Sequence, residues 1–469
     1  MHLNKCRCFI ALLLAVLISS CTMVFRKPDL TRLYMSADHA DQPPVIFLHG
    51  AFGSKLRDKV TKEEVWPGTL SNVLFGDQRR LAIEINRETL LPQTDLLEPY
   101  ALFDELAGRG FYRPIINTLT SAGDYVPTEL GTPSGGMSRR LYTFIYDWRL
   151  DISTNAAKLA EFIDQIRRDF GDQHLKVDLV AHSMGALVAR YFIRYGATDV
   201  LDADINVVPG YGTDKIRKLI MLGPPNSGTV SGLQNSMMGF QFGLRRIRPD
   251  IFATMPSTYQ TLPHPDRDWV IDIHGQGFDR SLYDASAWRE FGWGIFNSDL
   301  HQKIRSDFSS ELEFERYLDT LDSFLEKNLI RGKRLHRALS LPFGTADVQY
   351  IVFGGDCVLT AARCLVEEIN GELLTRLHPS AVVNRQPGVD YERLMLEPGD
   401  GMVTKSSALA RNSMDLAPLN HQLGDFPLAY SIFLCERHMD LTRNSSFQDN
   451  LLNILLVQST YADQPARSP

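Results

Sequence analysis

Short apolar runs alternate along much of the chain with segments whose apolar residues recur at helical spacing. Val45 to Leu48 form one such run, which stops at Gly50, and the segment KVDLVA (residues 176–181) forms another. Apolar runs of this length, bounded by glycine or proline, are typical of buried strands. Further strands are predicted within residues 141–150, 215–225, 347–356 and 429–438.

Two helices are predicted between these strands, over residues 151–170 and 185–196. The first carries apolar residues at helical spacing behind Asp151 and Ser153, which are suitable caps; they are Ala156, Leu159, Phe162, Ile163, Ile166 and Phe170. Strands that alternate with helices of this length require crossover connections, which produce a mostly parallel sheet covered on both faces. The predicted fold class is therefore α/β.

The length of 469 residues and the 44% hydrophobic content allow a large core. No linker-like tract divides the chain, which favours one enlarged domain with insertions. The predicted core spans 42–229, with an insertion at 50–110, and resumes at 343–459 before a tail at 460–469. Residues 230–342 are predicted to form a cap over the mouth of the sheet, with an amphipathic helix behind Ser310 and Glu313, which resemble a capping box.

The first 21 residues have the features of an export signal. Lys5 and Arg7 precede an apolar run that is too short to span a bilayer, and the run ends in ISSC. This ending resembles a bacterial lipobox, so we expect 1–20 to be a signal peptide, Cys21 to be lipidated and 21–41 to be an anchor linker. The expected location is the periplasmic side or the outer membrane, anchored at the membrane surface. The alternative is an ordinary cleaved signal with a soluble product.

The net charge limits the kinds of partner, and the cysteine content limits the possible disulfides and metal sites. A net charge of −7 without a basic tract argues against nucleic acid. Export leaves Cys357, Cys364 and Cys435, and an oxidising compartment permits a disulfide between the first two with one thiol left over. Their spacing resembles no zinc site, and neither a structural metal nor a cofactor is predicted.

Ser183 has the surroundings of a catalytic nucleophile. It lies in AHSMG between a predicted strand and a predicted helix, with Ala181 and Gly185 two residues to either side. A nucleophile elbow needs small residues at these positions, because the tight turn brings backbone close. The alternative is that Ser183 serves only as a helix N-cap.

A nucleophilic serine needs a histidine base and an acid, which follow it in that fold in the order Ser, Asp or Glu, His. His438 comes shortly after the last predicted strand and is favoured as the base, whereas His421 lies in a mixed loop. The spacing leaves Asp356 and Asp400 as alternative acids. The oxyanion donors would be the backbone N–H of Met184 and one from the loop after the first strand, Ala51 or Phe52.

The ordered set of motifs resembles the lecithin:cholesterol acyltransferase family. It comprises VIFLHGAFGSKL, YDWRLD, VDLVAHSMGALVARYF, LIMLGPPNSG, GDGMVTKSSAL and HMDLTRN. The resemblance implies an α/β-hydrolase fold, with the nucleophile at Ser183, the acid at Asp400 and the base at His438. It also places the loop oxyanion donor near Phe52.

The expected function is a serine-dependent lipid ester hydrolase or acyltransferase that works on acyl lipids through an acyl-enzyme. Phe240 and Phe242, near a group of arginines in the cap, suit an interfacial lid, although core packing explains them equally well. The alternatives are a small-molecule carboxylesterase and a lipoprotein that keeps the fold as a scaffold without catalysis.

Overall fold

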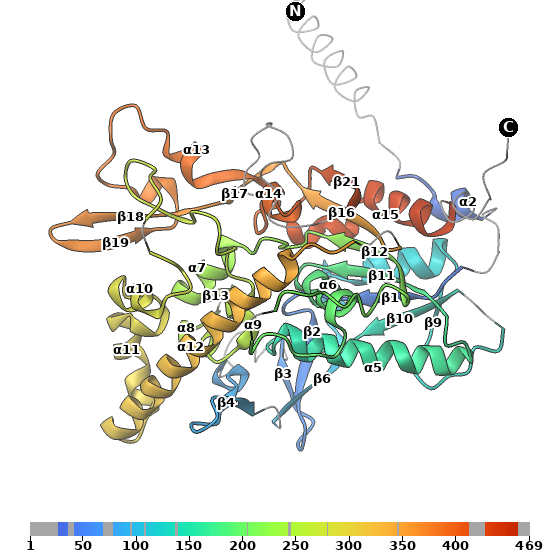
Figure 1. Ribbon diagram of the computed structural model, residues 1–469, viewed down its shortest axis with the longest axis horizontal. Helices are drawn as coiled ribbons and strands as arrows, with labels where there is room; N and C mark the ends of the chain where they lie inside the picture. The colour runs from blue at the N-terminus through green and yellow to red at the C-terminus, as the bar shows by residue number, and fades with distance from the viewer. Residues whose placement is uncertain are drawn as a thin grey trace, which may run out of the picture.

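A seven-stranded sheet, parallel in every pairing, forms the centre of the molecule in the computed structural model (Figure 1). The structure describes residues 27–35, 42–68, 78–93, 96–106, 109–136, 139–203, 205–242, 245–278, 280–344, 347–411 and 427–457. In spatial order the strands are β21 (Leu428–Leu434), β16 (Gln349–Gly355), β12 (Ile216–Leu222), β11 (Val177–His182), β1 (Val45–Leu48), β10 (Arg140–Phe144) and β9 (Val126–Pro127).

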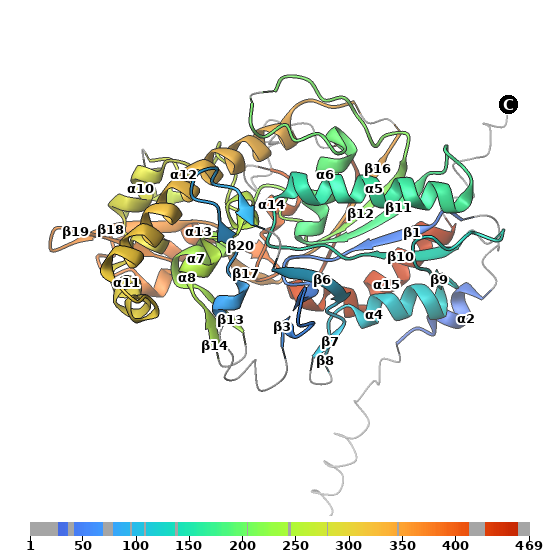
Figure 2. The ribbon, with the colours of Figure 1, turned by 90° about the horizontal axis from the view of Figure 1, so that it is seen from below.

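Helices cover both faces of this sheet, as Figure 2 shows. Side chains alternate between the faces of a strand. Ile46 and Leu48 therefore pack in the cluster that includes α5 (Ile152–Phe170) and α6 (Met184–Tyr195). Val45 and Phe47 pack on the opposite side with α4 (Arg113–Asn117) and α15 (Ser445–Leu452). The predicted α/β class, with a parallel sheet covered on both faces, is confirmed.

Helix α5 shows how local sequence fixes an element. Its N-cap is Asp151, which accepts a hydrogen bond from Ser153 N at 2.9 Å, and Gly171 ends it with a left-handed φ of 66°. Most of the predicted apolar stripe is buried; the buried members are Ala156, Leu159, Ile163 and Ile166. The helix is thereby held against the sheet along its length.

Residues 50–110 build small antiparallel sheets beside the first strand. The main one contains β2 (Ser54–Asp58), β3 (Glu64–Trp66) and β6 (Leu97–Leu102). The others pair β4 (Glu84–Ile85) with β5 (Pro92–Gln93) and β7 (Glu105–Leu106) with β8 (Arg109–Gly110). Trp66 is buried at the end of β3, where its Nε1–H donates to Phe52 O at 3.0 Å. The insertion is thus anchored to the loop that follows β1.

The cap lies to the left of the sheet in Figure 1. Its elements are α7 (Val230–Met238), β13 (Phe240–Phe242), β14 (Arg245–Ile247), α8 (Pro249–Phe252), α9 (Pro256–Gln260), β15 (Val270–Ile271), α10 (Ala285–Glu290), α11 (Ser298–Ile304) and α12 (Glu311–Ser340). Ser310 Oγ accepts a hydrogen bond from Glu313 N, whereas the Glu313 carboxylate accepts from Ser309 N. Ser310 is thus the N-cap of α12. In the expected capping box, the Glu313 carboxylate would accept from Ser310 N, but here it accepts from Ser309 N instead.

The cap also takes in part of the second half of the chain. After β16, the strands β17 (Val358–Ala361), β18 (Cys364–Ile369), β19 (Glu372–Arg376) and β20 (Leu396–Gly399) leave the central sheet, with α13 (Tyr391–Met395) before β20. Cys364 and Val366 pack in the same apolar cluster as Trp288 and Phe324 of the cap. The cap therefore extends beyond the expected 230–342 and mixes helices with strands.

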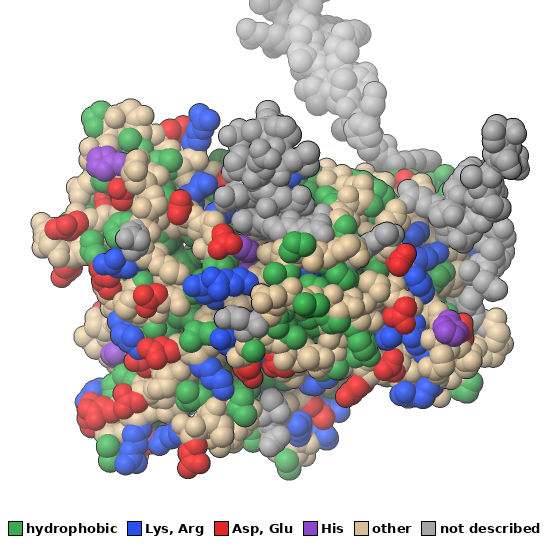
Figure 3. Space-filling model, viewed as in Figure 1, with side chains coloured by type: hydrophobic (Ala, Val, Ile, Leu, Met, Phe, Trp, Pro, Cys, Tyr) green, Lys and Arg blue, Asp and Glu red, His purple; other side chains and the backbone are tan. Residues whose placement is uncertain are grey.

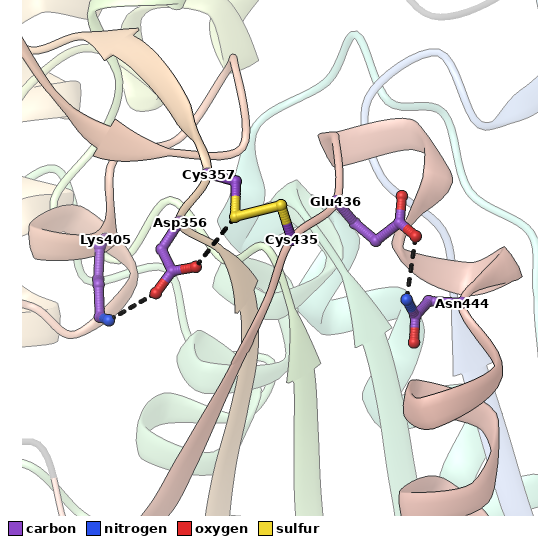
Figure 4. The surroundings of a disulfide bond; sticks show 6 residues. All are labelled: Asp356, Cys357, Lys405, Cys435, Glu436 and Asn444. Atoms are coloured by element: carbon purple, nitrogen blue, oxygen red, sulfur yellow. Dashed lines mark hydrogen bonds and ion pairs between the residues drawn. A yellow bond between two sulfur atoms is a disulfide. The ribbon is translucent and has the colours of Figure 1, made fainter. Parts of the chain in front are cut away.

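The permitted pair of Cys357 and Cys364 does not form: Cys357 bonds to Cys435 (Figure 4), and Cys364 is a buried free thiol. The strands β16 and β21 end side by side, with Gly355 opposite Leu434. Cys435 directly follows β21, and Cys357 comes two residues after the end of β16. Cys364 instead lies on β18, where its thiol donates to Trp269 O at 3.5 Å. Spatial neighbourhood at the sheet edge, rather than short sequence separation, decides the pairing.

Three further expectations concern parts of the chain outside the described residues. Cys21 with the signal segment, His421 and the tail all fall there. Within the described part, no helix combines the length and apolarity that crossing a bilayer needs. On the face drawn in Figure 3, basic and acidic side chains are interspersed.

We predict that replacing both Cys357 and Cys435 by serine lowers the free energy of unfolding by up to roughly 4 kcal/mol, because the bond closes a loop of 78 residues. Urea unfolding of the purified variant measures this change. In the non-reduced wild-type protein, peptide mapping should find Cys357 joined to Cys435, with Cys364 alkylated only after unfolding. A Cys357–Cys364 peptide would contradict the pairing.

Candidate active site

Ser183 occupies a sharp turn between β11 and α6. Its backbone has a φ of 54° and a ψ of −124°, a conformation that side-chain-bearing residues rarely adopt. The turn is crowded: a Cβ on Gly50 would lie 2.8 Å from Ser183 Cβ, and one on Gly185 would lie 2.5 Å from His49 O. The small residues around the serine are therefore a steric requirement of the turn, and the turn presents the hydroxyl above the sheet edge.

A chain of hydrogen bonds joins three side chains that are far apart in sequence. Ser183 Oγ lies 3.0 Å from His438 Nε2, and His438 Nδ1 lies 2.7 Å from Asp400 Oδ2. His438 begins a short 3-10 helix after β21, and Asp400 follows β20 directly. His438 and Asp400 are both buried. The strand ends thus bring together the nucleophile, base and acid expected from the sequence.

Backbone groups hold Asp400 in its ionised form. Met402 N and Val403 N donate to Asp400 Oδ1 at 2.9 and 2.7 Å, and His438 N donates to Asp400 O at 2.9 Å. Burial alone raises the pKa of this carboxyl, but the charge and hydrogen bond of His438 and the two backbone donors outweigh it, so the pKa lies below its ordinary value. The carboxylate is therefore charged when it orients the imidazole.

The alternative acid has a different partner. Asp356 Oδ2 pairs with Lys405 Nζ at 2.8 Å, and both side chains are partly exposed (Figure 4). Among the described residues, no contact joins Asp356 to His438. The contacts thus distinguish Asp400, which bonds to His438, from Asp356, which does not; the spacing in the sequence could not make this distinction.

Two glycines that the sequence analysis did not single out make room for the pair of acid and base. A Cβ on Gly223 would lie 2.8 Å from His438 Nδ1 and 3.0 Å from Asp400 Oδ2. One on Gly355 would lie 2.7 Å from Asp400 Cβ. Both glycines end central strands, and this position at the strand end was the signal available in the sequence.

The cavity that contains Ser183 is also lined by two residues whose backbone N–H groups are unpaired within the described part of the chain. Among the described residues, neither Phe52 N nor Met184 N has a hydrogen-bond acceptor, and both residues line the cavity that contains Ser183. Met184 is the first residue of α6, where backbone N–H groups lack intrahelical partners. Phe52 has a left-handed φ of 62°, and Trp66 holds its carbonyl. Unpaired backbone donors of this kind are what the stabilisation of a substrate oxyanion requires.

His182 is a packed residue beside the base. Tyr112 Oη accepts from Gly50 N at 3.0 Å and lies 2.9 Å from His182 Nδ1, so the tyrosine hydroxyl donates to the ring. Burial, followed by the charge of His438, lowers the pKa of His182 to about 3. The neutral His182 ring therefore fixes the turn without competing for the serine proton.

A cavity of about 340 Å³ opens over Ser183 and His438. Many of the residues that line this cavity are aromatic; they are Phe52, Trp66, Phe103, Phe111, Tyr112, Trp148, Phe240, Phe242 and Phe252. Phe240 stacks on Phe52 with ring centroids 4.7 Å apart, and Phe242 lies 4.5 Å from Trp66. The residues expected to form a lid therefore pack directly on the oxyanion loop and on the first insertion.

Among the residues that the structure describes, no group of three or more His, Cys, Asp or Glu side chains is arranged to hold a metal ion.

The fold and this arrangement define an α/β hydrolase. Residues 135–263 match the family model "Lecithin:cholesterol acyltransferase", which confirms the resemblance seen in the sequence over that segment. No curated protein matches the chain.

Several solved structures are similar to this chain. "The crystal structure of Tle4-Tli4 complex" is similar with a TM-score of 0.55 and 15% identity, over 90% of this chain and 99% of that one. A Staphylococcus hyicus lipase is similar with a TM-score of 0.34 and 12% identity, over 94% and 96% of the two chains. EstA from Clostridium botulinum has a TM-score of 0.35 and 12% identity, over 92% of each chain. At 15% identity, the likeness to the first of these structures concerns the fold alone.

We predict that Gly223→Ala slows fluorophosphonate labelling of Ser183 by roughly 100-fold, because the added methyl group displaces His438 from Asp400 and weakens general-base activation. The labelling rate of the purified protein is the measurement. Gly171→Ala is the matched control, since Gly171 also has a left-handed φ but a Cβ there meets nothing within 4 Å. Equal rates for the two variants would refute the steric argument.

We further predict that stability falls in acid. Burial lowers the pKa values of His49 and His264 to about 4 and those of His182 and His336 to about 3. The unfolded chain takes up these protons near pH 6.5, so stability is complete above that pH and decreases toward pH 4, by up to about 1.4 kcal/mol per pH unit for each histidine. Urea unfolding between pH 7.5 and 5 measures the slope. His336→Gln should flatten it, whereas a replacement of the exposed His274 should not.

Proposed function

We propose that this protein is a serine-dependent enzyme that acts on lipid esters, as a hydrolase or an acyltransferase. One observation carries the proposal: Ser183 is hydrogen-bonded through His438 to Asp400 at the base of an aromatic cavity. A scaffold protein would not need this hydrogen-bonded chain, because a buried, charged aspartate and a strained serine both reduce stability.

The proposed reaction follows from the order of the contacts. Ser183 Oγ attacks the ester carbonyl while His438 Nε2 takes the hydroxyl proton. Asp400 holds the imidazole in the required tautomer and stabilises its positive charge. The backbone N–H groups of Phe52 and Met184 stabilise the oxyanion. His438 then returns the proton to the leaving alcohol, and the remaining acyl-enzyme passes its acyl group to water or to a second alcohol.

The aromatic residues suit an acyl chain. Burying apolar surface contributes about 25 cal/mol per Å², and a cavity lined by Trp66, Trp148, Phe240 and Phe242 offers such surface next to Ser183. A chain-length series of nitrophenyl esters distinguishes this proposal from a small-molecule carboxylesterase, because only a lipid enzyme should gain in kcat/KM with a long chain.

Hydrolysis is the favoured outcome, because an acyl-enzyme that water can reach is hydrolysed unless the site excludes water. The partition is measured by supplying a labelled phospholipid or acylglycerol with and without a long-chain alcohol. A new labelled ester would identify an acyltransferase, and labelled free acid alone would identify a hydrolase.

We also propose that the mature protein is an exported lipoprotein anchored through Cys21, with the cavity working on lipids at the membrane surface. The support is the basic residues, short apolar run and ISSC of the first 21 residues. Metabolic labelling with a fatty-acid analogue, compared with Cys21→Ser, tests the anchor.

We predict that Ser183→Ala abolishes fluorophosphonate labelling and ester cleavage, and that His438→Ala and Asp400→Asn each reduce both by roughly 10³-fold or more. Asp356→Asn is the control, because its carboxylate pairs with Lys405 and should affect the rate little. Gel fluorescence of the labelled protein gives the measurement. A folded wild type that fails to label with detergent or vesicles present would favour the scaffold, and loss of labelling in Asp356→Asn alone would reverse the assignment of the acid.

A further inference from the structure

The cavity over Ser183 has two chemically different walls. The oxyanion loop, the first insertion and the β13–β14 hairpin supply an aromatic wall. The cap segment through α7 and α9 supplies a second wall, here called the hydroxyl wall and made of Thr229, Ser231, Asn235, Ser257, Thr258 and Thr261. A substrate that fills the cavity therefore contacts both an apolar and a hydrogen-bonding surface.

Part of the hydroxyl wall is already used by the fold. The hydroxyls of Thr229 and Ser231 donate to Met402 O, and that of Thr261 donates to Thr258 O at 3.1 Å. Met402 N in turn donates to Asp400 Oδ1. These bonds tie the wall to the loop that carries Asp400, so its position relative to the reacting serine is fixed.

The rest of the wall is available to a ligand. Within the described part of the chain, the Asn235 amide and the Ser257 and Thr258 hydroxyls have no hydrogen-bond partner, and all three residues line the cavity. A ligand that displaces water from such groups without replacing its hydrogen bonds loses affinity. The wall therefore selects for ligand atoms that donate and accept hydrogen bonds.

The same cavity offers no charge partner. None of the described residues that line it is Lys, Arg, Asp or Glu. Placing an ionised phosphate in such a space is costly unless a cation pairs with it. In a phospholipid only the glycerol carbons separate the phosphate from the ester groups, so a bound ester would hold its phosphate near Ser183 and the uncharged walls.

We propose that the hydroxyl wall binds a neutral head group that carries free hydroxyls, and that the preferred substrate is an acylglycerol rather than a phospholipid. This inference rests on the proposed function. The acyl chain lies along the aromatic wall, the ester carbonyl meets Ser183, and the glycerol hydroxyls bond to Asn235, Ser257 and Thr258. The bond that breaks joins the acyl carbon to the glycerol oxygen, which takes its proton from His438 as the alcohol leaves.

The first test compares substrates that share one acyl chain. Monooleoylglycerol, oleoyl lysophosphatidylcholine and oleoyl lysophosphatidylglycerol are presented to the full mature protein in the same neutral detergent micelles. We expect kcat/KM for monooleoylglycerol to exceed both lysophospholipids by at least roughly 10-fold, since one lost hydrogen bond or an unpaired charge has an effect of that order. Equal or faster cleavage of either lysophospholipid would overturn the inference.

The second test uses the hydroxyl wall itself. Asn235→Leu and Thr258→Val should each lower kcat/KM for monooleoylglycerol, relative to kcat/KM for nitrophenyl oleate, by roughly 10-fold. The reason is that each variant removes a hydrogen bond to the glycerol, and the nitrophenyl ester has no glycerol hydroxyl that could form this bond. Thr258→Ser should restore the ratio. Thr320→Val is the matched control, since its hydroxyl donates to Arg316 O on α12 outside the cavity and the ratio should stay unchanged. An unchanged ratio in both wall variants would refute the proposal that the hydroxyl wall binds the glycerol hydroxyls.

The outcomes separate the two proposals. If Ser183 labels and nitrophenyl oleate is cleaved but monooleoylglycerol has no advantage, the head-group inference fails and the proposed function stands. If Ser183 does not label and no ester is cleaved, both fail.

Discussion

The close approach of backbone segments around Ser183 is the constraint on which the rest of the site depends. The turn at Ser183 has a strained φ, and it exists only because Gly50 and Gly185 leave space for it. A second pair of glycines at the ends of β12 and β16 leaves space for His438 and Asp400. The sheet thus holds the hydroxyl, the imidazole and the carboxylate at hydrogen-bonding distance by steric exclusion on every side.

The loops that carry the acid and the base are braced from outside the sheet. The disulfide of Cys357 and Cys435 ties the segment after β16 to the one before His438. On the acid side, Ser406 Oγ and Arg267 both bond to Glu397, so the loop through Asp400 is fixed to the cap as well as to the core. A network of this kind holds one arrangement, because the loss of Arg267 or Glu397 would leave the charge of the other largely unpaired. The cap therefore has a structural role in the site besides covering it.

Much of the fold follows from local pattern. The central strands and α5 have runs and caps that a single stretch of sequence contains, and the elbow at Ser183 is visible because Ala181 and Gly185, two of the small residues it needs, lie within five residues.

The sequence analysis failed where chain segments meet only in space. The disulfide depends on strand pairing between β16 and β21, so the spacing that permitted a Cys357–Cys364 pair did not identify Cys435 as the partner. Spacing left Asp356 and Asp400 equivalent, and only family resemblance separated them before the hydrogen bonds did. The strands β17, β18 and β19 joined the cap because their apolar residues complete a cluster built by distant helices.

The two-walled cavity also bears on whether water or an alcohol receives the acyl group. On the proposal above, the glycerol that leaves Ser183 departs along the hydroxyl wall, and an acceptor alcohol would approach the acyl-enzyme along the same wall, because transfer to an alcohol reverses the first step. Hydrolysis needs a water molecule beside the acyl-enzyme at the hydroxyl wall. Transfer to an alcohol needs the acceptor alcohol to occupy the hydroxyl wall while the aromatic wall excludes water. The groups that select a neutral head group are therefore the same groups that set the partition between hydrolysis and transfer, so substrate preference and reaction type are coupled in this site.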